Sequence, residues 1–282
     1  MFEGITLSGF ADEIDTNLDK QIEVITKLGI NHIEMRGVNG KGLVEYSLDE
    51  VKAIKKILDE HNIHLSSIGS PIGKIKIEDD FEPHFELFCH TVEIAKIMET
   101  PYIRMFSFFI DQEKNPEDFR DEVMKRLHRM ADYAKEQGVI LLHENEKDIY
   151  GDIAPRCLDI MKELYSDNFK AVFDFANFVQ CKQDTLEAYE MLKPYIAYVH
   201  IKDAKWADGS VVPAGTGDGN VKKILGMLKE SGYQGFLSLE PHLAEFAGFS
   251  ALEKEGSIGH KLTGEEAYTL AYNSLQAVLK EL

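Results

Sequence analysis

The sequence predicts a single-domain α/β fold, a (β/α)8 TIM barrel that spans residues 1–282. Eight short apolar runs recur along the chain with starts 26 to 40 residues apart, which suits one strand followed by one helix. The stretches between these runs repeat apolar residues with the period of a helix. Eight such units favour a barrel. A doubly wound open sheet is the alternative, but no GxGxxG loop follows the first run.

The expected strands are rich in β-branched and aromatic residues, which is typical of strands buried on both faces. They are residues 5–10, 32–36, 64–68, 102–106, 139–144, 170–174, 196–200 and 236–240. The expected helices are residues 15–28, 48–61, 82–98, 116–137, 154–165, 185–192, 221–231 and 265–282. Several of these helices are followed by a glycine, a common helix stop. No Pro-, Gly- or Ser-rich linker divides the chain, so we expect one domain.

Charge and cysteine content limit the partners. The chain has 49 Asp and Glu against 31 Lys and Arg, a formal net charge of −18. Such a surface repels phosphate backbones and anionic membranes, so we expect no nucleic-acid and no membrane partner. The three cysteines, Cys89, Cys157 and Cys181, show no CxxC pairing, and no apolar run reaches the ~18 residues of a membrane span. We therefore expect a cytoplasmic protein.

Ionisable residues end the last four expected strands, where a barrel of this kind carries its chemistry. They are Glu144, Asp174, His200 and Glu240. An unpaired buried carboxylate is costly, so three carboxylates and an imidazole at one barrel mouth require a compensating cation. Three oxygen donors and one nitrogen suit Mn²⁺, our first choice, or Mg²⁺ or Co²⁺, and Zn²⁺ also fits. We therefore predict one divalent metal ion at this mouth.

Several motifs together resemble the xylose isomerase-like TIM barrel superfamily, in its sugar phosphate isomerase/epimerase branch. These are the sequences IEMR at 33–36, HEN at 143–145, DFAN at 174–177, HIKD at 200–203 with the glycine-rich loop at 213–219, and Leu239-Glu240. The resemblance implies metal ligation by the same four residues. It also implies that Glu144 and Glu240 act as acid and base on a small sugar or polyol, through a metal-stabilised enediolate.

The chain departs from the ketose 3-epimerases of this superfamily. Asn177 stands where they have a histidine, Trp206 where they have an arginine and Tyr150 where they have a glutamate. We predict an isomerase or epimerase of a small sugar or polyol, and an inosose-type dehydratase with the same metal site is the alternative. The endonuclease IV branch is disfavoured, because the expected third and fourth strands end without the extra histidines of its zinc site and the net charge opposes DNA binding.

Five further residues are candidates for substrate binding. Glu34 and Arg36 alternate with apolar neighbours and should face the same side of their strand, as a substrate-facing pair or a stabilising ion pair. Lys202 should face the mouth, Trp206 offers an aromatic wall for a sugar face, and Asn177 follows Asp174. The long stretch 244–262 is expected to form a lid or part of a dimer interface, and a homo-oligomer is left open.

Overall fold

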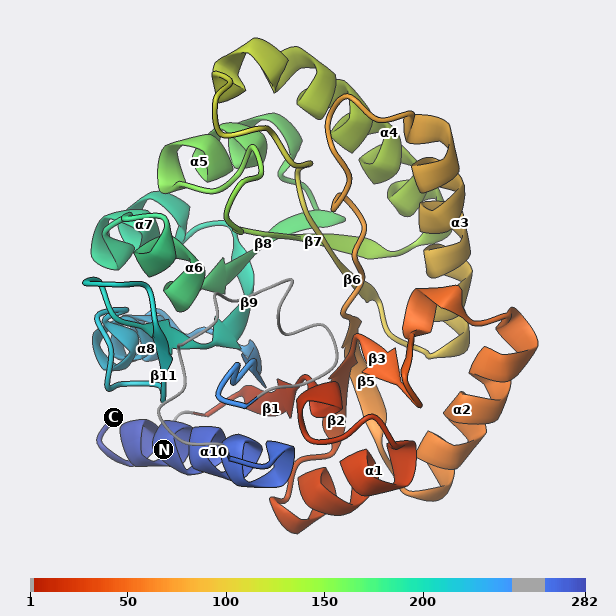
Figure 1. The fold of residues 1–282 in the computed structure, drawn as a ribbon, viewed down its shortest axis with the longest axis vertical. Helices are drawn as coiled ribbons and strands as arrows, with labels where there is room; N and C mark the ends of the chain where they lie inside the picture. Colours follow the sequence, from red (N-terminus) through yellow and green to blue (C-terminus); the bar gives the residue numbers. More distant parts are fainter. Residues whose placement is uncertain (1–2, 245–261) are drawn as a thin grey trace.

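Eight parallel strands form the wall of a barrel, and the helices surround it (Figure 1). This computed structural model describes residues 3–244 and 262–282. The strands are β1 (Ile5–Gly9), β2 (His32–Met35), β5 (His64–Ile68), β6 (Tyr102–Met105), β7 (Ile140–Glu144), β8 (Phe169–Asp174), β9 (Ile196–Ile201) and β12 (Gly235–Leu239). Each lies within one residue of its predicted bounds at both ends. The predicted barrel is therefore confirmed.

The strand order is β1-β12-β9-β8-β7-β6-β5-β2. Strands β1 and β2, at the two ends of this order, lie side by side, so the barrel is nearly closed. All seven ladders are parallel. The carboxyl ends of all eight strands consequently meet at one rim, and a residue at the end of any strand faces the same space.

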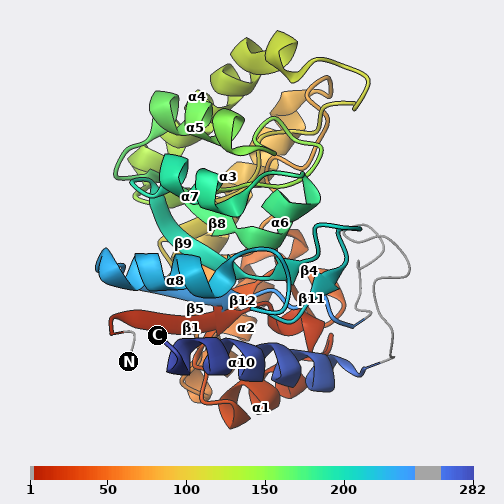
Figure 2. The ribbon, with the colours of Figure 1, turned by 90° about the vertical axis from the view of Figure 1, so that its left-hand side faces the viewer.

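The helices cover the outside of this wall with their apolar faces. They are α1 (Leu18–Lys27), α2 (Leu48–Glu60), α3 (Phe81–Ile97), α4 (Arg120–Gln137), α5 (Ala154–Leu164), α6 (Phe175–Gln180), α7 (Thr185–Leu192), α8 (Val221–Glu230) and α10 (Gly264–Lys280). A side view shows α8 and α10 running roughly along the direction of β1 (Figure 2). Their buried residues, such as Leu225 and Leu275, join the main hydrophobic core. Burial of these apolar faces holds the helices to the strands.

Most of the short elements were not predicted, although η3 falls within the predicted helix 116–137. They are the 3-10 helices η1 (Ala11–Glu13), η2 (Leu43–Glu45) and η3 (Pro116–Phe119), and the two-residue strand pairs β3 (Gly37–Val38) with β4 (Lys41–Gly42) and β10 (Asp203–Ala204) with β11 (Val211–Val212). Helix α6 was also missed, because it is only six residues long and begins directly at the end of β8. Asp174 is its N-cap and accepts the backbone N–H of Asn177 at 2.7 Å.

The expectations for the stretch 244–262 and for membrane spans can be compared only with the residues that the structure describes. Almost all of the predicted lid or interface stretch lies outside them, since residues 245–261 are not described. Within the described ranges, no helix is both long and apolar enough to cross a membrane.

The carboxylate of Asp203 organises the glycine-rich loop after β9. Asp203 is fully buried and accepts the backbone N–H groups of Ala204, Gly215, Gly217 and Gly219, each at 2.9 Å. A Cβ atom on Gly217 would lie 2.5 Å from its Oδ1, so this close approach requires glycine. Asp203 therefore holds the loop that follows Lys202 against the rim.

We expect Asp203→Ala to destabilise the fold by about 2–4 kcal/mol, because it leaves four backbone donors without their charged acceptor. Thermal unfolding measured by circular dichroism checks this value. Asp208→Ala is the matched control, since Asp208 is an exposed aspartate in the same loop that accepts the Ser210 N–H. Equal stability of the two variants would contradict the proposed role of Asp203.

The buried imidazole of His84 in α3 anchors the loop after β5. Its Nε2 accepts the backbone N–H of Gly73 at 2.7 Å, next to Lys74 at the rim. Burial, with the nearby Arg126 guanidinium, lowers the pKa of His84 to about 4. Accepting this hydrogen bond requires the unprotonated nitrogen, so the loop depends on a neutral ring.

We expect a loss of stability as the pH falls from about 6.5 towards 4. An unfolded histidine takes up a proton near pH 6.5, whereas the folded protein keeps His84 neutral to about pH 4, so in this window the unfolded chain binds more protons. The stabilisation is thus complete above pH 6.5 and is lost below it. Urea unfolding at pH 7 and pH 5 measures the effect, and the His84→Gln variant should show a weaker pH dependence than the wild type. A slope unchanged by this substitution would reject His84 as a source.

Candidate metal centre

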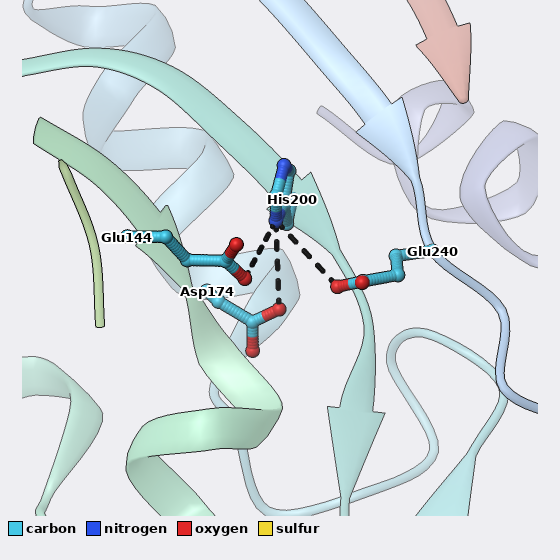
Figure 3. Close-up of side chains that lie close together, drawn as sticks. All are labelled: Glu144, Asp174, His200 and Glu240. Carbon is cyan, nitrogen blue, oxygen red and sulfur yellow. Dashed lines mark hydrogen bonds and ion pairs between the residues drawn. The ribbon is translucent and has the colours of Figure 1, made fainter. Parts of the chain in front are cut away.

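The four predicted ligands lie together at the rim of the barrel. Glu144 ends β7, Asp174 ends β8, His200 lies near the end of β9, and Glu240 directly follows β12. These strands are consecutive in the barrel wall, and Asp174 and His200 are direct partners in the ladder between β8 and β9. One ligand atom from each residue lies within 4.8 Å of the others, and all four residues are buried. Figure 3 shows the three carboxylates converging on the imidazole.

The His200 ring directs its two nitrogens to opposite sides. Nδ1 faces the carboxylates, at 2.9 Å from Glu144, 3.5 Å from Glu240 and 3.9 Å from Asp174 (Figure 3). Nε2 lies 3.1 Å from Glu34 Oε2. The rings of Phe10 and Tyr198 pack edge-on to the imidazole, with centroids 5.3 and 5.7 Å away. The ring is thereby fixed with Nδ1 towards the cluster.

Two buried cations approach the same carboxylates. Lys202 Nζ lies 2.9 Å from Glu240 Oε2 and 3.2 Å from Asp174 Oδ2. Arg104 Nη1 lies 3.1 Å from Glu144 Oε2 and 3.7 Å from Glu240 Oε1. The Arg104 guanidinium is held by the carbonyls of Gly69 and Ser70 and lies over the rings of Phe10 and Phe106. Such pairing is what makes buried carboxylates tolerable.

Each of the two glutamates therefore has one oxygen on either side of the cluster. Glu144 Oε1 and Glu240 Oε2 face His200 Nδ1. Glu144 Oε2 and Glu240 Oε1 face Arg104 Nη1. The two carboxylates thus share Arg104 Nη1 as a neighbour on one side and His200 Nδ1 as a neighbour on the other.

The ionisation of the cluster reflects its crowding. Burial raises the pKa of Asp174 to about 7, with Glu240 and Glu144 adding to the rise and Lys202 opposing it. Burial would also raise the pKa of Glu240, but Lys202, His242 and His200 hold it well below its ordinary range. The cations on the chain therefore compensate these two carboxylates unequally, and Asp174 is less well compensated than Glu240.

The donor set fits a divalent cation. Three carboxylates and one imidazole nitrogen converge in a buried space, a mixed oxygen and nitrogen set that Mn²⁺, Mg²⁺, Co²⁺ and Zn²⁺ accept. Asp174 Oδ2 accepts no hydrogen bond from the part of the chain that the structure describes, and it points into the cluster. A second, overlapping group of Glu13, Glu240 and His242 also comes together, but the Arg36 guanidinium lies 3.3 Å from Glu13 and 3.6 Å from Glu240.

The five predicted substrate residues occupy different places. Lys202 lies in the cluster, and Arg36 reaches its edge from a bidentate pair with Asp12. Asn177 donates to Glu144 Oε1 at 3.3 Å and to the Asn145 carbonyl at 2.8 Å. Glu34 contacts His200 from the interior of the barrel and does not pair with Arg36.

Trp206 lies apart from these residues. It is 42% exposed, and its described contacts are with Lys182 and Asp218. None of these contacts reaches the four ligands, so a substrate role for Trp206 stays a prediction.

Arg104 and Glu13 were missed by the sequence interpretation. Arg104 lies inside the expected strand 102–106, and a charged residue in so apolar a run was the available signal. Glu13 comes from η1, and its buried carboxylate accepts the backbone N–H of His242 at 2.7 Å. No local pattern marks Glu13, because its partners Arg36 and His242 belong to other elements of the chain.

Comparison with known proteins relates the chain to enzymes of several activities. The 3-dehydroshikimate dehydratase of Bacillus anthracis is 22% identical over 184 residues, which cover 64% of this chain and 64% of the dehydratase, less than two thirds of its length. The inosose isomerase of Halalkalibacterium halodurans is 24% identical over 251 residues, which cover 85% of this chain and 88% of the isomerase.

Solved structures share the fold over nearly the whole chain. The structure of the IOLI protein with a bound zinc atom is 19% identical, with a TM-score of 0.75 and 98% of both chains covered. A xylose isomerase-like TIM barrel protein from Mycobacterium smegmatis in complex with magnesium is 18% identical, with a TM-score of 0.68 and coverage of 98% of this chain and 97% of that one. The family model described as xylose isomerase-like TIM barrel matches residues 22–262 of this chain. The chain thus belongs to the xylose isomerase-like TIM barrel family.

Proposed function

We propose that the protein is a divalent-metal-dependent isomerase or epimerase of a small sugar or polyol. The observation that carries this proposal is the division of Glu144 and Glu240 between two sides. One oxygen of each faces His200 Nδ1, and the other faces Arg104 Nη1. Two carboxylates brought this close together can exchange protons with a substrate carbon that binds beside them. The similarity to an inosose isomerase supports this reaction class.

In this proposal Glu144, Asp174, His200 and Glu240 hold the metal ion. A bound divalent ion supplies Lewis-acid chemistry, because it polarises a carbonyl and stabilises the negative charge of an enediolate. Mn²⁺ remains our first expectation from the donor set, and the zinc and magnesium found in structures of the same fold support Zn²⁺ and Mg²⁺ equally as candidates. Asn177, which donates to Glu144 Oε1, helps to orient that ligand.

The protein's own residues then move the proton. One of Glu144 and Glu240 removes the proton from the carbon next to the substrate carbonyl, and the other returns a proton to the opposite face of that carbon or to its neighbour. Lys202 and Arg36, whose charged groups lie beside Glu240, are proposed to hold substrate oxygens. Glu144, Lys202 and Glu240 are buried, and this burial keeps bulk water away from the exchanging proton.

An inosose-type dehydratase is the second candidate, and the similarity to a 3-dehydroshikimate dehydratase favours it. Its first step is the same removal of a proton next to a carbonyl. In the second step a hydroxyl on the adjacent carbon leaves with a proton as water, and a carbon–carbon double bond forms. The same two glutamates serve as base and acid in both reactions.

We propose the cytoplasm as the location of the enzyme, with a small sugar or polyol as its substrate. The three cysteines are unpaired in the structure, which supports a reducing compartment. The acidic net charge of −18 continues to disfavour nucleic acid.

Glu144→Gln and Glu240→Gln should each slow exchange of the substrate C–H with deuterium by about 10²-fold or more, since each removes one proposed proton carrier. Proton NMR in D2O measures this exchange, with inosose and 3-dehydroshikimate as first probes. An ultraviolet signal from an unsaturated product distinguishes the dehydratase from the isomerase.

Measurement of the bound metal distinguishes a variant that has lost a proton carrier from a variant that has lost only a metal ligand. Wild-type protein reconstituted with Mn²⁺, Zn²⁺ or Mg²⁺ should hold about one ion per chain, and we expect Asp174→Asn to regain exchange at high metal concentration while the two glutamine variants do not. Exchange at the wild-type rate in both glutamine variants would show that the acid and base assignment is wrong.

Lys202→Met should destabilise the metal-free protein by about 3–5 kcal/mol, because Asp174 and Glu240 would lose their buried cation. A bound divalent ion should restore much of this loss, since it compensates the same carboxylates. Thermal unfolding with and without Zn²⁺ measures both effects. Lys193→Met is the control, because Lys193 forms an exposed pair with Glu190 and should change stability by less than about 1 kcal/mol. A metal-free Lys202→Met protein as stable as this control would refute the charge argument.

A further inference from the structure

A fully buried carboxylate, Glu34, lies behind the candidate metal centre and contacts none of the three ligand carboxylates directly. It belongs to β2, whereas His200 belongs to β9, and β1 and β12 separate these strands in the barrel wall. Glu34 therefore reaches His200 through the interior of the barrel. Its Oε2 lies 3.1 Å from His200 Nε2 and accepts the Ser238 hydroxyl at 2.7 Å.

This position does not suit a substrate contact. Glu34 is 0% exposed, and the His200 ring stands between it and the carboxylates at the rim. The hydrogen bonds from His200 and Ser238 to the Glu34 carboxylate both go to Oε2. Its Oε1 has no hydrogen-bond partner among the described residues. A substrate at the mouth would meet the face of His200 that carries Nδ1 (Figure 3).

We infer that Glu34 is a positioning residue that fixes the tautomer and orientation of His200 for metal binding. A histidine that offers Nδ1 to an ion carries its ring proton on Nε2. The Glu34 carboxylate accepts a hydrogen bond from that nitrogen and so favours this tautomer, as carboxylates behind metal-binding histidines commonly do. The inference rests on the proposed metal centre.

Further buried hydroxyls lie in the same interior layer of the barrel. The Tyr198 hydroxyl bonds to Ser66 Oγ at 2.8 Å, and Ser66 Oγ bonds to Ser8 Oγ at 2.6 Å. Ser238, which holds Glu34, is the ladder partner of His200 on the neighbouring strand. This layer supplies a matched control, because Ser8 has the same burial and a hydrogen bond of similar length, but that hydrogen bond goes to Ser66 instead of Glu34.

The test measures Zn²⁺ binding to the full chain by calorimetry after removal of metal with a chelator. We expect Glu34→Gln, which removes the negative charge but keeps the shape, to weaken Zn²⁺ binding by about 10- to 100-fold. Ser8→Ala should keep the wild-type affinity within about twofold, because its side-chain hydrogen bond goes to Ser66 and not to Glu34 or His200. In the zinc-loaded protein, NMR of the imidazole should show the His200 Nε2–H resonance shifted upfield in Glu34→Gln and unchanged in Ser8→Ala.

The outcomes separate this inference from the proposed function. Zn²⁺ binding to the wild type with no loss in Glu34→Gln, or with an equal loss in Ser8→Ala, overturns the role of Glu34 and leaves the metal centre intact. No Zn²⁺ binding by the wild type overturns both. If Glu34→Gln does not fold, Ser238→Ala takes its place, with an expected loss of about 3- to 10-fold, and wild-type affinity in that variant overturns the inference.

Discussion

The burial of three carboxylates at one end of the barrel is the constraint on which the rest of the site depends. Glu144, Asp174 and Glu240 lose their hydration there, and such groups are stable only beside cations or hydrogen-bond donors. Lys202 and Arg104 meet this need from two sides, and His200 meets it from a third. Because these cations are themselves buried and held by neighbouring groups, the position of each carboxylate is fixed by its partner, which is the preorganisation that proton transfer requires.

The parallel barrel brings these charged residues together although they lie far apart in the sequence. Glu144 and Glu240 are far apart in the chain, yet β8 and β9 alone separate their strands in the wall. Each strand brings its last residue to the same rim, and the ladder sets their relative heights, so that Asp174 and His200 are direct partners. One residue per strand is enough to assemble the cluster, and the helices outside keep the wall in place through apolar burial alone.

The sequence was sufficient for the strands and for the four cluster residues, because both are local features. An apolar run bounded by polar residues shows where a strand ends, and the residue at its end faces the rim whatever the details of the barrel. The partners of Glu34 and Arg104 could not be predicted in this way. Glu34 meets His200 through the barrel interior and Arg104 reaches Glu144 from the neighbouring strand, and these contacts depend on strand stagger and side-chain length. Alternation predicted only that Glu34 and Arg36 face the same side of their strand; whether Glu34 faces substrate or another side chain is a property of the packed interior.

Each of the two glutamates directs one oxygen to His200 and the other to Arg104. This arrangement bears on why an isomerase and a dehydratase both occur among the relatives of this chain. Glu144 and Glu240 each present one oxygen to His200 at the candidate metal centre, and each presents the other oxygen to the Arg104 guanidinium. In our proposal this arrangement commits the protein only to the removal and return of protons next to a carbonyl. The fate of the resulting enediolate depends on whether the adjacent carbon carries a hydroxyl aligned to leave. In our proposal that alignment is set by the residues that would hold the substrate, Lys202 and Arg36 among them, and not by the two glutamates. Reaction class within this architecture is therefore a question of substrate orientation, which can change while the buried carboxylates stay the same.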